Sequence, residues 1–392
     1  MTPLHSVFVL DLTRVLSGPY CTMMLGDLGA RVVKVEQPGK GDDTRAWGPP
    51  FQGKESAYFL SVNRNKESLT LDFKHPDGRA LLERLIARAD VLVENFRPGA
   101  MSRLGLDAAA LTAKFPRLIY CSISGFGQTG PRAKEPGYDA VMQGEGGLMS
   151  ITGPPDGPSY RLGVAIADIV TGMFAAQGVT AALFARERTG RGQVVDIGML
   201  DSVAALLTYQ AGIHFATDAA PGRLGNRHPT IVPYETFSAS DGEFVLAVGN
   251  DELWRRFCGV AGLDLGERFA TNRQRVSGYA ELRPILAERL ATRTRTAWIA
   301  AFTGAGVPCG SVRDLSELFA DPQVAARAMV EEVAHATLGP IRVLGTPLKL
   351  SDTPASIRAA PPVLGQHTTS ILTKDLQLAP DAIEALRAKG VI

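Results

Sequence analysis

The feature that most constrains the fold is a repeated alternation of strand-like and helix-like segments. Short apolar runs alternate with segments of helical length, and glycine or proline marks many of the junctions. This alternation predicts a parallel, doubly wound, Rossmann-like α/β sheet. The strand-like runs are Val7–Leu12, Arg31–Glu36, Ser68–Phe73, Asp90–Asn95, Leu118–Ser124 and Gln193–Gly198, and the main helix-like runs are Tyr20–Leu28, His75–Ala89, Asp107–Lys114 and Ile169–Phe184.

A second, smaller domain is indicated by a change of character after the sixth strand. A chain of 392 residues exceeds what one hydrophobic core usually supports. Residues 219–233 carry prolines and glycines, and they are followed by a hairpin pattern (234–248) and by helices near 253–259 and 280–303. We expect a large domain over 1–218, a small α+β domain over 219–335 and a C-terminal segment over 336–392.

The balance of charge excludes a global electrostatic attraction to nucleic acid or to an anionic membrane. There are 41 basic and 40 acidic residues, so the formal net charge is +1. The four cysteines are widely spaced without a CxxC pair, which favours reduced thiols in a cytoplasmic protein over a metal site or disulfides. The apolar run 169–184 falls short of the ~20 residues of a membrane span, so we expect a core helix.

One carboxylate stands alone at the start of that apolar run. Between Arg161 and Arg186, Asp168 is the only side chain able to carry charge. It can simply cap the helix by accepting hydrogen bonds from the first free amides. The same amides and the helix dipole could instead keep the carboxylate ionised in a dry pocket, where it could attack an electrophile. The pattern alone favours the cap, because caps are far commoner than nucleophiles.

The loops after the predicted strands are rich in glycine and proline, and ligands of such sheets bind at these loops. They read VLSGP, QPGKGDD, NFRPG and GFGQTGP. Turn formation explains any single one of them, and a phosphate-bearing ligand explains them together. A dinucleotide fold with Glu36 as the ribose-binding acid is the tempting alternative. The first turn contains no GxGxxG, however, so the signal for an NAD-dependent dehydrogenase is weak.

Several stretches, spread in order over nearly the whole chain, belong together. They are RVLSGPYCTMMLGDLGARVVKVEQPGKGDDTRAWGPP, SVNRNKESLTLDFK, DVLVENFRPGAMSRLGL, PRLIYCSISGFGQTGP, GYDAVMQGEGGLMSITG, GVAIADIVTGM, ERTGRGQVVDIGMLDS and PPVLGQHT. These stretches resemble one family, the class III CoA-transferases, which includes formyl-CoA transferase and carnitine CoA-transferase. The runs GDDTRAWGPPF, YFLSVNRNK, IVPY and GVPCG are most similar to its succinate–hydroxymethylglutarate branch.

The resemblance implies a fold, an assembly and a reaction. The C-terminal segment would return to the large domain, and two chains would form an interlocked homodimer. The aspartate nucleophile of the family falls on Asp168, and the substrates would be an acyl-CoA and a carboxylic acid. No permanent cofactor and no metal are implied. The residues that match the family's CoA-binding positions are Leu16, Ser17, Leu71, Asp72, Phe73, Lys74, Asn95, Phe96, Arg97, Arg103, Tyr138 and Asp139.

Departures from the family pattern bear on the substrate. Formyl-CoA transferase has glutamine at the position of Leu16 and arginine at that of Gln37, so transfer of formyl or oxalyl groups is doubtful here. A longer dicarboxylic acyl group, such as succinyl, would need a cation to bind its distal carboxylate. We expect Arg14 or Arg45 in that role, with Trp47 as a wall of the acyl pocket.

Two alternatives share the fold. A 2-methylacyl-CoA racemase would need two bases at the α-carbon, and such racemases place a histidine where this chain has Tyr138. A non-catalytic acyl-CoA-binding protein would have no need to keep Asp168. Both residues therefore favour a transferase.

Overall fold

The computed structural model describes residues 1–392 and divides them into two compact units. The first comprises residues 1–148, 161–212 and 322–392, and the second comprises 149–160 and 213–321. The predicted boundaries after 218 and 335 lie 6 and 14 residues beyond the ends at Gly212 and Asp321, and residues 149–160, expected in the large domain, belong to the second unit. Each unit has a hydrophobic core of its own.

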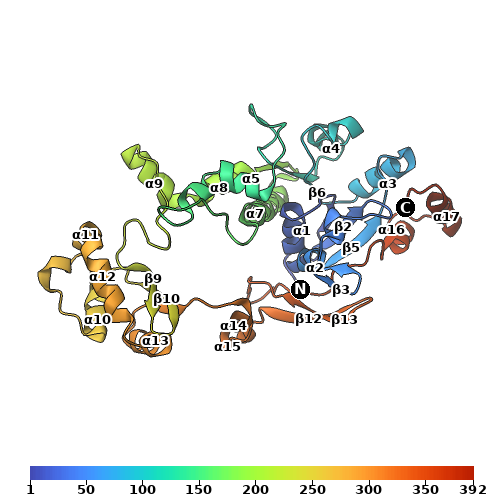
Figure 1. Cartoon of the computed structure of the whole chain (residues 1–392). Coiled ribbons are helices and arrows are strands. Elements are labelled where there is room, and N and C mark those ends of the chain that lie inside the picture. The colour runs from blue at the N-terminus through green and yellow to red at the C-terminus, as the bar shows by residue number, and fades with distance from the viewer. The chain divides into compact units, whose positions relative to one another are not determined.

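The first unit is built on a six-stranded parallel sheet of order β5-β2-β1-β6-β7-β8. In chain order this is 3-2-1-4-5-6, the order of a dinucleotide-binding Rossmann fold, so the α/β expectation is confirmed. The order reverses between β1 and β6. Figure 1 labels its strands β2, β5 and β6. The strands are β1 (Phe8–Asp11), β2 (Arg31–Glu36), β5 (Lys66–Thr70), β6 (Val91–Glu94), β7 (Ile119–Ser124) and β8 (Val194–Gly198).

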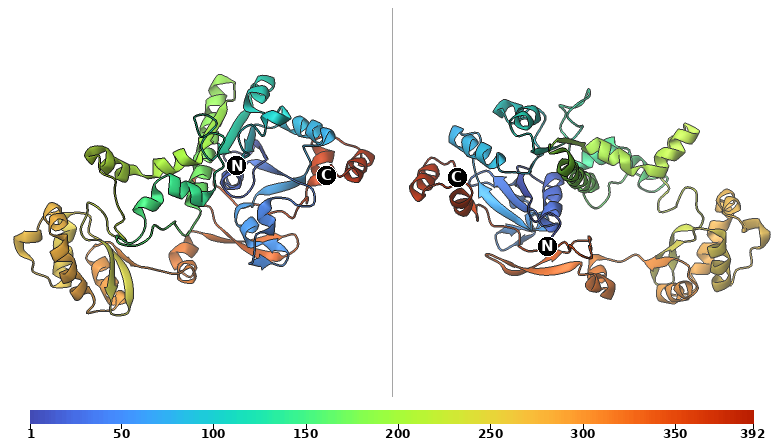
Figure 2. Two further views of the ribbon diagram at one scale, coloured as in Figure 1. Left: turned by 45° about the horizontal axis from the view of Figure 1, so that its top comes forward. Right: turned by 180° about the vertical axis from the view of Figure 1, so that it is seen from behind.

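Helices cover both faces of this sheet (Figures 1 and 2). Successive residues of a strand point to opposite faces: Val32 packs beneath α1 and α7, while Val33 packs on the other side. The first face carries α1 (Ser17–Asp27) and α7 (Ile166–Thr189), and the second carries α3 (Pro76–Ile86), α4 (Ala108–Lys114), α16 (Thr368–Lys374) and α17 (Pro380–Ala388).

The C-terminal segment belongs to the first unit and docks beside β5. The backbone N–H of Ser68 donates to Nδ1 of His367 at 3.1 Å, and Thr70 bonds the hydroxyl of Thr368. His367 therefore serves to attach this segment. Smaller elements of the unit are α2 (Ala57–Val62), α5 (Asp139–Glu145), α8 (Met199–Leu206) and the hairpins β3 (Phe51–Gln52)–β4 (Glu55–Ser56) and β12 (Val330–His335)–β13 (Gly339–Leu344).

The second unit contains an antiparallel sheet of order β11-β10-β9 covered by helices. Its core is aromatic, with Trp298 stacked on Phe302 and Phe302 on Phe257. The single helix expected near 280–303 is two, because Thr294 accepts a hydrogen bond from the amide of Ala297 and starts a new helix. The elements are β9 (Tyr234–Ala239), β10 (Gly242–Ala247), β11 (Cys309–Ser311), α10 (Asp251–Ala261), α11 (Asn272–Ser277), α12 (Tyr279–Leu290) and α13 (Arg295–Gly304).

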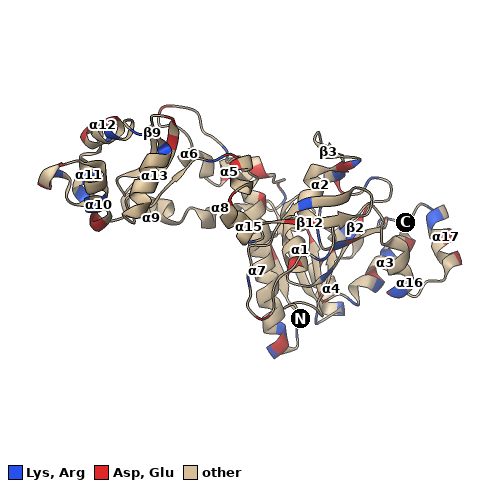
Figure 3. Ribbon diagram, turned by 90° about the horizontal axis from the view of Figure 1, so that it is seen from below, with Lys and Arg blue, Asp and Glu red and all other residues tan.

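Helix α7 is longer than the sequence predicts, with 24 residues from Ile166 to Thr189. By length and composition alone it is able to cross a membrane, although the core helix of a soluble protein passes the same test. Its charged residues lie towards its ends (Figure 3). Its buried face packs on α1 and on strands β7 and β8, which agrees with the expected core helix.

Candidate active site

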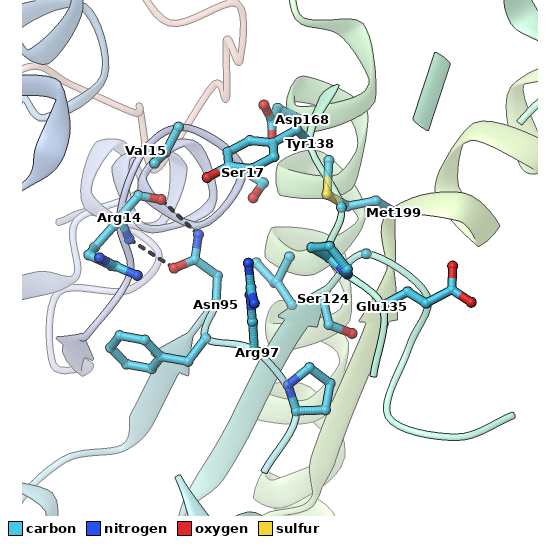
Figure 4. Close-up of a pocket in the computed structure, with 16 residues that line it drawn as sticks. Arg14, Val15, Ser17, Asn95, Arg97, Ser124, Glu135, Tyr138, Asp168 and Met199 are labelled. Atoms are coloured by element: carbon cyan, nitrogen blue, oxygen red, sulfur yellow. Dashed lines mark hydrogen bonds between the residues drawn. The ribbon is translucent and has the colours of Figure 1, made fainter. Parts of the chain in front are cut away.

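A cavity of about 150 Å³ opens at the carboxyl edge of the sheet, where the strand order reverses. The loops after β1, β6 and β7 supply most of its wall, as expected for a doubly wound sheet. Figure 4 shows the side chains converging on it. The lining residues are Arg14, Val15, Ser17, Asn95, Phe96, Arg97, Pro98, Ile123, Ser124, Gly125, Glu135, Pro136, Gly137, Tyr138, Asp168 and Met199.

Asp168 lies in this cavity, in the first turn of α7 (Figure 4). The prediction that its side chain caps the helix was wrong. The helix begins at Ile166, its N-cap position is Ala165, and Asp168 is the third helical residue. Asp168 does not cap the helix, and it lines the cavity.

The electrostatic surroundings of Asp168 favour the protonated form more than the sequence indicates. Burial, followed by the nearby Asp139 carboxylate, raises the pKa of Asp168 to about 7. Hydrogen bonds from the hydroxyl and the backbone amide of Ser17 act in the opposite direction. The expectation of a carboxylate held firmly ionised is therefore corrected: at neutral pH both protonation states are populated.

Tyr58 is a neighbour of Asp168 that sequence reasoning missed. It lies on α2, and burial, followed by the charge of Asp168, raises its pKa to about 12. It packs in a small apolar cluster with Leu16 and Ile169, which flank the site. The sequence offers no local signal for this contact, because more than a hundred residues separate Tyr58 from Asp168.

The loop between β1 and α1, which leads to Ser17 at the start of α1, is held in place by buried charged side chains. Val15 has φ of +70°, a conformation that is strained for a β-branched residue. Its amide donates to Asp42 Oδ1 at 3.2 Å. The other oxygen of Asp42 pairs with Lys34 Nζ at 2.8 Å, where neither side chain is exposed, and Lys34 also donates to the carbonyl of Thr13.

The same loop is fixed from the side by Asn95. Its Oδ1 accepts from the backbone amide of Arg14 at 2.9 Å, and its Nδ2 donates to the Arg14 carbonyl at 2.7 Å (Figure 4). Both polar atoms of the Asn95 amide are thus already engaged with the chain. Asn95 lines the cavity and also joins the loop after β6 to the loop after β1.

A second, larger cavity of about 460 Å³ shares Arg14 and Phe96 with the first. The Arg14 guanidinium lies 5.4 Å from the centre of the Phe96 ring and pairs with Asp43 at 3.2 Å. The shared residues connect the cavities, so one extended ligand could occupy both. Predicted CoA-binding residues in this wall are Leu71, Asp72, Phe73, Lys74, Phe96 and Arg103, and the sequence analysis missed Lys34 and Lys40, which also line it.

Cations with no ionic partner mark both cavities. Arg97 lines the first cavity and Arg103 the second, and neither forms an ion pair. Both side chains are exposed. Guanidinium groups in such positions suit phosphate or carboxylate groups of a ligand.

Several predicted site residues do not reach the cavities. Leu16 is buried in the apolar cluster beneath the loop. The Arg45 guanidinium is engaged with Glu36 at 2.7 Å, with Glu55 and over the Phe59 ring at 3.6 Å. Glu36 itself lines the larger cavity, but both of its carboxylate oxygens accept hydrogen bonds from protein groups, including Ser68 and the Asp42 amide, which does not favour a role in ribose binding.

Of the three residues expected at the acyl pocket, only Arg14 lines the cavity with Asp168. Trp47 is 41% exposed and packs edge-on against Tyr58 with ring centres 5.1 Å apart. Tyr138 lines the cavity and is 64% exposed, and no histidine lines it. A histidine base of the racemase type is therefore not present at this position.

Asp139 does not line either cavity, although the sequence places it among the CoA contacts. Its Oδ1 accepts from the backbone amide of Ala167 at 2.9 Å. The cap expected of Asp168 is thus provided by another helix. Ser124, which the sequence analysis missed, lines the cavity at the end of β7, and its buried hydroxyl has no hydrogen-bond partner.

The geometry describes an aspartate in the smaller of two adjoining cavities, with an arginine that forms no ion pair in the wall of each, Arg97 in the first and Arg103 in the second. No group of three or more His, Cys, Asp or Glu side chains is placed to hold a metal ion. The expected CoA contacts at Leu71–Lys74, Asn95–Arg97 and Arg103 come together in space although they are separated in sequence.

Comparisons with known proteins agree with this arrangement. The chain is 44% identical over 397 residues to succinyl-CoA:glutarate CoA-transferase of Mus musculus, covering 100% of this chain and 91% of the relative. It is 44% identical over 382 residues to succinate–glutarate CoA-transferase of Agrobacterium fabrum, covering 95% of each chain. The crystal structure of a CaiB/BaiF family protein from Brucella suis superposes with a TM-score of 0.84 and 42% identity, covering 95% of this chain and 99% of that one.

The model of CoA-transferase family III matches residues 4–368. Because this match and the relatives extend over nearly the whole chain, the protein belongs to CoA-transferase family III and is an enzyme that transfers CoA.

Proposed function

We propose that the protein moves CoA from succinyl-CoA, or a similar dicarboxylic acyl-CoA, to a carboxylic acid through covalent intermediates on Asp168. The observation that carries this proposal is the position of Asp168 in a cavity connected to a second, cation-lined cavity. The relatives named for succinyl-CoA and glutarate support the class of acids.

The nucleotide end of CoA would occupy the larger cavity. Lys74 and Arg103 lie in its wall and would meet the phosphates. The pantetheine arm would pass Phe96 and Arg14, where the two cavities join, and bring the thioester to Asp168. This path uses the geometry without requiring a metal or a redox group.

The chemistry follows from the carboxylate. Ionised Asp168 attacks the thioester carbon, the carbon–sulfur bond breaks, and a mixed anhydride and CoA thiolate result. The thiolate then attacks the aspartyl carbonyl, which releases the donor acid and leaves an aspartyl-CoA thioester. The acceptor carboxylate reverses these two steps. Asp168 must be ionised for the first step, so we expect the rate to rise with pH through about 7.

Orientation and exclusion of water are tasks of the surrounding residues. The Ser17 hydroxyl and amide hold one side of the Asp168 carboxylate. The acyl group would face Arg14, the cation that could meet a distal carboxylate. Water in this space would hydrolyse the anhydride, so a filled cavity is part of the mechanism.

We also infer that the protein is cytoplasmic and acts as an interlocked homodimer. The assembly rests on the family resemblance. It is supported by exposed apolar side chains on the outer side of α7 and on β8, namely Met173, Phe184 and Val194. The location rests on the four unpaired cysteines.

The test is to trap the intermediate. Incubation with succinyl-CoA followed by hydroxylamine or borohydride should modify Asp168, as located by peptide mass spectrometry. Asp168→Ala should lose transfer and labelling while retaining CoA binding, whereas the exposed-loop control Asp352→Ala should behave as the wild type. Turnover in the absence of any adduct, or near-normal turnover of Asp168→Ala, would refute the mechanism.

A further inference from the structure

The segment that leads into α7 is held by a chain of hydrogen bonds from α5. Asp139 Oδ1 accepts from the backbone amide of Ala167 at 2.9 Å, and Asp139 Oδ2 accepts from Gln143 Nε2 at 2.8 Å. The remaining amide oxygen of Gln143 accepts from the backbone amide of Leu162 at 2.9 Å. These hydrogen bonds thus tie α5 to two backbone amides, those of Leu162 and Ala167, in the segment that leads to Asp168.

All four polar side-chain atoms of Asp139 and Gln143 form hydrogen bonds within the protein. Gln143 is fully buried, and burying its amide without these partners would be costly. Asp139 begins α5 and supplies the side-chain cap that α7 lacks from its own residues. Ala167, whose amide it binds, directly precedes the proposed nucleophile.

We propose that Asp139 and Gln143 are positioning residues that set the orientation and the ionisation of Asp168. This inference rests on the nucleophilic role proposed above. It differs from the contact with CoA expected from the sequence, because both oxygens of Asp139 already accept hydrogen bonds from the protein.

The charge of Asp139 adds an electrostatic effect to the positioning. Next to burial, it is the main cause that raises the pKa of Asp168. A carboxylate of higher pKa is a stronger nucleophile once ionised, at the cost of a smaller ionised fraction below neutral pH. The other titratable or charged groups around Asp168 are Tyr58 on α2 and, in the cavity wall, Arg14, Arg97, Glu135 and Tyr138.

Two variants separate the two effects. Asp139→Asn keeps an oxygen for the Ala167 amide but removes the charge and, with it, the acceptor for Gln143 Nε2, so the pH midpoint of kcat should fall by more than half a pH unit. Comparison with Gln143→Met, which loses the same hydrogen bond and retains the charge, isolates the effect of the charge. Gln143→Met keeps the volume and the charge but breaks the chain of hydrogen bonds. It should lower kcat at least tenfold with little change in the midpoint, since small displacements of a reacting group are costly.

The measurement is kcat and KM for acyl-CoA from pH 5.5 to 8.5. The control is Glu145→Gln, an acid-to-amide change on the same helix at an exposed residue that pairs with Arg132. A raised KM with unchanged kcat and midpoint for Asp139→Asn would mean that Asp139 contacts CoA, and would overturn the proposal. Wild-type kcat in Gln143→Met would overturn the role of Gln143.

A direct titration keeps this test apart from that of the proposed function. Carbon NMR of protein labelled at the aspartate carboxyl groups follows Asp168, whose signal is assigned by its loss in Asp168→Asn. The Asp168 midpoint should fall in Asp139→Asn even if no CoA transfer is found with any substrate. An unchanged midpoint in a folded Asp139→Asn protein refutes the electrostatic coupling whatever the activity.

Discussion

Replacing Asp168 by asparagine should stabilise the folded protein at alkaline pH. The folded protein raises the pKa of this carboxyl from an ordinary value of 3.8 to about 7. Above pH 3.8 the unfolded chain has released this proton while the folded protein retains it, so stability falls as pH rises until the folded group also ionises. The loss is complete above about pH 7.

The size of the effect follows from the shift. About three pKa units at 1.36 kcal/mol each give at most about 4 kcal/mol at pH 8. Asparagine has nearly the same shape and carries no charge at any pH. The difference in unfolding free energy between Asp168→Asn and wild type should therefore grow between pH 4 and pH 7 and then level off.

The assay is urea unfolding followed by tryptophan fluorescence and by circular dichroism at pH 4, 5.5, 7 and 8.5. Agreement of the two probes checks that the two units unfold together. Asp352→Asn, at an exposed loop position, is the control for charge removal in general. A stability difference that does not change with pH, or a variant less stable than wild type at pH 8.5, would refute the account of an unpaired, desolvated nucleophile.

Two further predictions concern residues that support the site. Gly172→Ala should lower kcat at least tenfold and lower the free energy of unfolding by about 1–3 kcal/mol, because an added Cβ would lie 2.6 Å from the Ser17 carbonyl oxygen and push α7 away from α1. The control is Gly212→Ala, where no atom lies within 4 Å of the added Cβ, and equal behaviour of the two variants in urea and kinetic assays would contradict the reasoning. Asp42→Ala should lower the free energy of unfolding by about 3–5 kcal/mol, as expected when one partner of a buried ion pair is removed, because buried Lys34 then loses its ion-pair partner and Val15 its hydrogen-bond acceptor. A urea midpoint within error of wild type would show that Lys34 does not depend on this partner.

Strands β1, β6 and β7 were predictable because each is a short apolar run whose side chains are buried on both faces of the sheet. The second strand was predicted with the observed bounds, Arg31–Glu36. The hairpin β12–β13 was missed, because Glu331 and Glu332 interrupt the apolar pattern of β12 and only Ile341 and Val343 of β13 are buried apolar residues. The assignment of Asp168 as a cap was wrong because the cap is distant in sequence. Helix α7 starts at Ile166, and Asp139 on α5 accepts the hydrogen bond from the Ala167 amide in its first turn.

The candidate site was predictable where the family motif and the loop position agree, as for Asp168 and Arg103. It was not predictable where the function of a residue depends on a distant partner. Arg45 is a cation in a loop by sequence, but Glu36 and Glu55 engage it in the interior. Gly172 is one small residue of an apolar run by sequence, but in the structure its lack of a side chain permits the close approach of α1.

The pKa values of two buried carboxyl groups, Asp42 and Asp168, are shifted in opposite directions, and the difference bears on the role of Asp168. Burial alone would raise the pKa of Asp42, but Lys34 and the amide and hydroxyl of Thr44 lower it to about 2. That carboxylate remains ionised and serves to hold a loop. No cation pairs with Asp168, whose charged neighbour of greatest effect is another carboxylate. A lysine beside Asp168 would make it more fully ionised but less reactive, so the absence of such a partner is what a nucleophile at this position requires.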